Sequence, residues 1–108
     1  MGIERELMRG SGPLAVLQLL ARREMYGYEI VTALTRETGG ALTMGQSTLY
    51  PLLYNLEAKG WISSRNVDSE EGRTRRYYAL RRAGQKELAR QRKDWQSLAR
   101  AMTSLGIL

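Results

Sequence analysis

The chain has 108 residues, of which 43% are hydrophobic and 26% charged, and this composition fits one globular domain rather than a disordered segment. It contains no cysteine and no histidine, which excludes disulfides and removes the commonest metal ligand and the commonest general base. We therefore expect no metal, no cofactor and no enzymatic activity. The formal net charge of +6 favours a polyanionic partner, either nucleic acid or an anionic membrane surface.

The N-terminus lacks the marks of a secretory signal. Charged residues occupy positions 4–6, where an apolar segment would have to begin. The longest apolar stretch, over 13–21, is too short to cross a bilayer. From these two features we expect a cytoplasmic protein that has no membrane partner.

Apolar residues at helical spacing predict four helices in the first part of the chain. Their approximate bounds are 1–9, 13–23, 28–38 and 45–59. The run 10–13 separates the first two helices, and Gly39 with Gly40 ends the third. Residues 41–44 are expected to form a brief strand. Pro51 lies early in the fourth helix and leaves a later start open.

The second half of the chain predicts a β-hairpin and then one long helix. Residues 61–67 and 73–80 read as strands, and the turn-forming residues 68–72 join them. The segment 82–105 carries apolar residues at the a and d spacing of a coiled coil, with a polar gap at Gln91.

Helices followed by a two-stranded hairpin form the winged helix-turn-helix arrangement. The expected fold is therefore mainly α with a two-stranded β-hairpin. Residues 1–80 would form the N-terminal helix and the winged helix DNA-binding domain. Residues 81–108 would form a long C-terminal dimerisation helix.

Two groups of side chains suit a DNA phosphate backbone. Hydroxyls gather where the 45–59 helix begins, and free N–H groups and the helix dipole favour an anion there; capping by Ser47 and packing by Tyr50 are the alternative. The second group is the arginine-rich strand of the hairpin, which suits a wing that contacts phosphates or the minor groove. A charged edge strand is the alternative there. The predicted DNA-binding residues are Gln46, Ser47, Thr48, Tyr50, Tyr54, Arg73, Arg75, Arg76 and Tyr77.

Strand alternation divides the arginine-rich strand between two faces. Arg73, Arg75 and Tyr77 share one face, while Arg76 and Tyr78 share the other. Leu80 lies on the face of Tyr78 and should point inward. We therefore expect Tyr78 in the core and Tyr77 more exposed.

The apolar seam of the C-terminal helix needs a surface to pack against. A second copy of the chain is the economical partner, because the preceding helices and the hairpin already supply a core. The alternative is that the helix folds back on its own domain. The predicted dimer-interface residues are Ile3, Leu7, Leu88, Trp95, Leu98, Met102 and Leu105.

Several short motifs, in this order and spacing, resemble the PadR family of winged helix regulators. They are YGYEI at 26–30, STLYPLL at 47–53, LEAKGWI at 56–62 and the wing with its following strand at 72–80. The resemblance spans nearly the whole chain. It implies a dimeric transcriptional regulator, usually a repressor, that binds an inverted-repeat operator through a recognition helix beginning at 47–51 and a basic wing.

The resemblance also implies a role for Trp95. Some short members of the family hold flat aromatic or cationic ligands between tryptophans in the dimer interface, so Trp95 is a candidate effector contact. Simple interface packing is the alternative. The sequence departs from the family pattern at Arg81, where a capping threonine is common, and after Gly72, where the wing usually opens with a second glycine or a proline.

The expected function is thus a sequence-specific DNA-binding regulator that acts as a homodimer. A sensor that binds a small aromatic effector is compatible with this function. An interaction module that uses the winged helix to bind protein is the alternative from another class.

Overall fold

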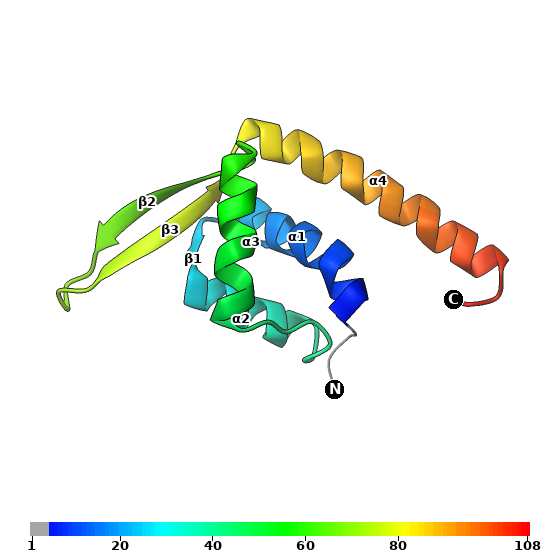
Figure 1. Cartoon of the computed structure of the whole chain (residues 1–108), viewed down its shortest axis with the longest axis horizontal. Coiled ribbons are helices and arrows are strands. Elements are labelled where there is room, and N and C mark those ends of the chain that lie inside the picture. The colour runs from blue at the N-terminus through cyan, green and yellow to red at the C-terminus, as the bar shows by residue number, and fades with distance from the viewer. Residues whose placement is uncertain (1–4) are drawn as a thin grey trace.

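The computed structural model describes residues 5–108. In chain order the elements are α1 (Arg5–Arg22), β1 (Met25–Tyr26), α2 (Gly27–Glu37), α3 (Gln46–Ala58), β2 (Ile62–Asp68), β3 (Thr74–Leu80) and α4 (Arg82–Ser104). Figure 1 shows α1, α2 and α3 grouped together, with the β2–β3 hairpin extending to one side and α4 to the other. The expected class, a mainly α winged helix-turn-helix with a long C-terminal helix, is confirmed.

Within the described residues the sheet has three antiparallel strands in the order β1-β3-β2, so the hairpin carries one strand more than expected. The extra strand pairs Met25 with Tyr78 and Tyr26 with Tyr77. The predicted strand at 41–44 is wrong, because that segment forms only bends and irregular backbone. A strand of two residues is too short to show a period, so the sequence pattern could not locate β1.

The predicted break between two N-terminal helices is also wrong, because α1 runs through Pro13 without interruption. Proline removes one helical hydrogen bond, and here tertiary packing on both sides of it outweighs that loss. Met8 packs against the core, and Gly12 is buried beside Met44 and Leu52. A Cβ at Gly12 would make ordinary van der Waals contacts with the side chains of Met44 and Leu52, at 3.5 and 3.6 Å.

One hydrophobic core joins the helices to the base of the hairpin. Its buried members are Val16, Leu17, Leu19, Leu20, Met25, Ile30, Ala33, Leu34, Met44, Leu49, Leu53, Leu56, Ile62, Tyr78 and Leu88. Tyr78 is 5% exposed, which confirms its predicted inward orientation. Leu88 of α4 was predicted to lie in the dimer interface, but it is 6% exposed in the single chain and packs in this core. Its burial therefore needs no partner.

Glycine and backbone hydrogen bonds set the path from α3 into the hairpin and on to α4. Gly60 has a φ of 78°, and the Trp61 N–H donates to the Leu56 carbonyl at 3.1 Å. The Arg81 N–H donates to the Trp61 carbonyl at 2.9 Å, which ties the start of α4 to the start of β2. Arg81 is the N-cap residue of α4, and its side chain makes no capping hydrogen bond.

Candidate nucleic-acid interface

The exposed side of α3 presents a hydroxyl-rich row of side chains. Ser47, Tyr50 and Tyr54 are all exposed, Tyr54 by 68%, and helical spacing puts them on one side of the helix. The ring of Tyr50 rests against Gly27 at the start of α2. A Cβ at Gly27 would lie 2.8 Å from the Tyr50 hydroxyl oxygen. The absence of a side chain at Gly27 therefore lets the Tyr50 ring pack against the backbone of α2.

The other two predicted residues of this helix differ in position. Gln46, the first residue of α3, is exposed and lies one turn before Tyr50 on the same side of the helix. Thr48 is exposed too, but it lines a groove between α1 and α3 together with Leu52 and Asn55. The structure therefore brings Gln46, Ser47, Tyr50 and Tyr54 together and leaves Thr48 on another side of the helix.

One face of the wing turns toward α3 through a small polar cluster. The Arg76 guanidinium lies 3.7 Å from the Glu57 carboxylate of α3. The Ser64 hydroxyl of β2 donates to the same carboxylate at 2.7 Å. Glu57 lies three residues beyond Tyr54, so Arg76 faces the same side of α3 as the exposed tyrosines.

Glu57 and Ser64 were absent from the predicted site. Glu57 lies about one helical turn beyond Tyr54, and Ser64 pairs with Tyr78 across the hairpin. Helical spacing and strand register could therefore have suggested these two residues. Burial raises the pKa of the neighbouring Tyr78 hydroxyl above the ordinary value for tyrosine.

The opposite face of the wing holds a stack of aromatic rings and guanidinium groups. The Arg75 guanidinium carbon lies 4.6 Å from the centroid of the Tyr26 ring, and the Tyr26 and Tyr77 centroids lie 5.4 Å apart, edge to face. Arg65 lies over Tyr77 and pairs with Glu24, and its hydrogen bonds lower the pKa of that carboxyl group. Arg75 and Tyr77 are thus on the face away from α3, and the predicted arginines do not form a single surface.

The tip of the wing is set by a tight turn that leaves Arg73 exposed. Gly72 has a φ of 78°, and its N–H donates to the Ser69 carbonyl at 3.0 Å. The Ser69 hydroxyl accepts from the Arg73 N–H at 3.2 Å. The tip therefore has a defined backbone, from which the Arg73 side chain extends into solvent.

The outer half of α4 extends away from the rest of the chain (Figure 1). Trp95 is 38%, Leu98 44% and Leu105 73% exposed, and Met102 is half-buried. Trp95 borders an apolar hollow of about 310 Å³ whose other wall is the Leu14 side of α1. Leu7 is exposed on α1. Ile3 lies outside the described residues.

No group of three or more histidine, cysteine, aspartate or glutamate side chains within residues 5–108 is arranged to hold a metal ion. In the same part of the chain, every helix is too short or too polar to cross a membrane.

The helix pair α2–α3 with an antiparallel hairpin beside α3 defines a winged helix regulator. A model of the transcriptional regulator PadR-like family matches residues 16–90. The chain belongs to this family. It is a transcriptional regulator and not an enzyme.

Individual relatives agree with this assignment over most of their length. The chain is 36% identical over 98 residues to "Transcriptional regulator Rv3488" of Mycobacterium tuberculosis, covering 89% of this chain and 86% of that protein. A transcriptional regulator from Clostridium thermocellum superposes with a TM-score of 0.84 at 27% identity, covering 92% of this chain and 96% of the other. A PadR family regulator from Eggerthella lenta gives a TM-score of 0.82 at 30% identity, with 93% and 85% covered.

Proposed function

We propose that the chain is a sequence-specific DNA-binding repressor that binds an inverted-repeat operator as a homodimer. It would act in the compartment that holds the DNA, which we expect to be the cytoplasm. The winged helix domain over 1–80 would contact DNA, and the segment 81–108 would join two copies. One observation supports the proposal most strongly. The exposed side of α3 and the Arg76 face of the wing lie next to each other and form one continuous surface.

The two parts of this surface, α3 and the wing, supply different interactions. Ser47, Tyr50 and Tyr54 can donate hydrogen bonds to base edges or phosphates from a helix laid in the major groove. Arg76 and the exposed Arg73 would contact the phosphate backbone beside the groove. The Glu57 carboxylate, which holds Arg76 in the free protein, would exchange this partner for a phosphate.

A two-fold dimer explains why the operator should be an inverted repeat. Two recognition helices related by a dyad enter successive major grooves about 34 Å apart. The exposed seam formed by Trp95, Leu98, Met102 and Leu105 supports pairing through α4. Burial of such an apolar stripe against a second copy removes its side chains from water and so favours association.

We expect Arg76→Ala to weaken binding to a mixed-sequence duplex by roughly tenfold at low salt, because one charge-assisted contact is lost. Salt titrations followed by fluorescence anisotropy should show the slope of log affinity against log salt reduced by about one ion.

Arg75→Ala is the matched control for this measurement. It removes the same side chain from the same strand, but its guanidinium is held on Tyr26 on the face away from α3. Its effect on affinity should be clearly smaller. Equal losses in the two variants, or no loss in either, would contradict the proposed surface. No binding by the unmodified protein at low salt would favour a module that binds protein.

A second function is favoured by the hollow beside Trp95. The indole, with Leu14, Ala15 and the stem of Arg92, lines a surface that is almost wholly apolar. We infer that a flat aromatic molecule could stack on Trp95 there, and that a second copy of the chain would close the site. Plain packing of Trp95 in the dimer interface is the rival explanation.

The tryptophan site can be tested by fluorescence quenching with proflavine, a planar tricyclic dye. In a Trp61→Phe background only Trp95 emits, and we expect saturable quenching of its emission. In a Trp95→Phe background only Trp61 emits, and quenching should be weak. Quenching of equal strength in both backgrounds would assign the dye to non-specific surface binding.

A further inference from the structure

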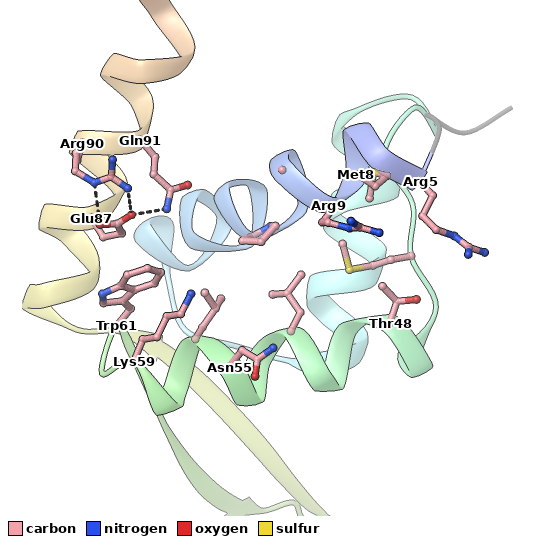
Figure 2. A pocket seen from close by; sticks show the side chains of 15 residues that line it. Arg5, Met8, Arg9, Thr48, Asn55, Lys59, Trp61, Glu87, Arg90 and Gln91 are labelled. Atoms are coloured by element: carbon pink, nitrogen blue, oxygen red, sulfur yellow. Dashed lines mark hydrogen bonds and ion pairs between the residues drawn. The ribbon is translucent and has the colours of Figure 1, made fainter. Parts of the chain in front are cut away.

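A second, larger groove lies between α1, α3 and the first turns of α4 (Figure 2). Its volume of about 680 Å³ is within the range of small-molecule sites. Its floor consists of the aliphatic and thioether side chains of Met8, Met44, Leu52 and Leu56. Methionines adapt their shape to a bound apolar chain better than rigid branched residues do.

The rim of this groove is cationic. Arg5 and Arg9 extend from α1 at one end, and Lys59 extends from the end of α3 at the other (Figure 2). Arg5 and Arg9 have no carboxylate partner within residues 5–108. Glu87, the carboxylate that residues 5–108 contribute to the rim, already accepts hydrogen bonds from Arg90 at 2.5 Å and from Gln91 at 2.6 Å. Among the described residues, no carboxylate therefore balances the charge of Arg5 and Arg9 above the apolar floor.

The aromatic wall of the groove is already occupied. The Lys59 ammonium lies 4.8 Å from the centroid of the Trp61 ring, so this cation covers one face of the indole. A planar ring would have to displace Lys59 to stack there. An aliphatic chain needs only the floor formed by methionine and leucine, so the lining favours a chain over a ring.

The groove and the hollow proposed for aromatic ligands lie on opposite sides of α1 and share no lining residue. Arg5 and Arg9 are on one side of α1, whereas Leu7, Ser11 and Leu14 are on the opposite side at 3.6 residues per turn. Ser11 and Leu14 line the hollow beside Trp95, and neither lines this groove. Gln91, the polar position of the α4 seam, lines the groove, so a dimer formed through Trp95, Leu98 and Met102 would border the groove at this edge only.

We propose that this groove binds a medium-chain aliphatic carboxylate, with the chain on Met8 and Leu52 and the head group against Arg5 and Arg9. The proposal is independent of DNA binding. Because Leu52 belongs to α3, the bound chain would touch the helix that we assign to the major groove.

Decanoate, added as a free monomer below its micelle concentration and without lipid, is the probe. In full-length protein carrying Trp95→Phe, only Trp61 emits, and we expect saturable change of its emission. Calorimetry on the unmodified protein should give the same affinity. Decylammonium and 1-decanol have the same chain length but lack the anionic head. Each should bind at least about tenfold more weakly than decanoate.

The double variant Arg5→Gln with Arg9→Gln should lose about tenfold in decanoate affinity and should no longer prefer decanoate over decanol. The control is Lys86→Gln with Lys93→Gln, which removes the same net charge from exposed positions outside the groove. This control should bind as the parent does, and circular dichroism should show both variants folded. The proposal is overturned if decanoate does not bind, if it binds no better than decylammonium, or if both double variants lose affinity equally.

Discussion

Replacing Gly84 with alanine should destabilise the protein by about 3 kcal/mol, which is large for the addition of one methyl group. Gly84 is buried where α4 begins, and a Cβ there would collide with the Trp61 carbonyl group and lie 2.7 Å from the Leu80 Cδ1 atom. The Trp61 carbonyl accepts the hydrogen bond from the Arg81 N–H, so it cannot move without loosening the start of α4. Urea unfolding followed by circular dichroism measures the change.

Gly10→Ala is the matched control, because Gly10 also lies inside a helix but has open space where its Cβ would be. Alanine is the better helix former, so this variant should be as stable as the parent or up to about 1 kcal/mol more stable. If Gly84→Ala unfolded at the same urea concentration as Gly10→Ala, α4 would not pack on the Trp61 backbone as the structure has it.

Replacing Leu98 with aspartate should convert a dimer into a monomer. Leu98 is 44% exposed and lies in the middle of the uncovered seam between Trp95 and Met102. In a dimer paired along this seam it would be buried, and an unpaired buried carboxylate weakens association by several kcal/mol. We therefore expect the dissociation constant to rise at least about 100-fold. Sedimentation equilibrium checks this directly.

Gln96→Asp introduces the same charge two residues earlier on another side of α4. It should leave the association constant close to that of the parent. If Leu98→Asp remained dimeric, the copies would associate through another surface. A parent protein that is monomeric at high concentration would remove the basis for a two-fold operator.

The sequence was sufficient for the architecture because its strongest patterns are local. Alternation along the second wing strand correctly placed Tyr78 in the core, and Gly39 with Gly40 ends α2 with both φ values positive. The continuity of α1 through Pro13 was not predictable in this way. Around Pro13 the helix packs beside Met44 and Leu52, which are distant in sequence.

The candidate site was less predictable for the same reason. Residue types correctly marked α3 and the wing as the basic and hydroxyl-rich elements, and alternation correctly separated Arg75 from Arg76. No local pattern could show that Tyr26 would take up the Arg75 guanidinium or that Glu57 would approach Arg76, since both contacts join separate elements. Leu88 fitted the α4 seam by spacing, yet the packing of α4 on α1 buried it within one chain.

Selection of bound sequences from a random pool of DNA duplexes tests the proposed interface most directly. We expect enrichment of one half-site that occurs twice in inverted orientation, with centres about 34 Å apart. A Tyr50 or Tyr54 variant should shift the enriched bases, whereas Arg76→Ala should lower recovery without changing them. A pool that stays random after repeated selection, or a unique site without two-fold symmetry, would contradict binding of DNA by a two-fold pair of α3 helices.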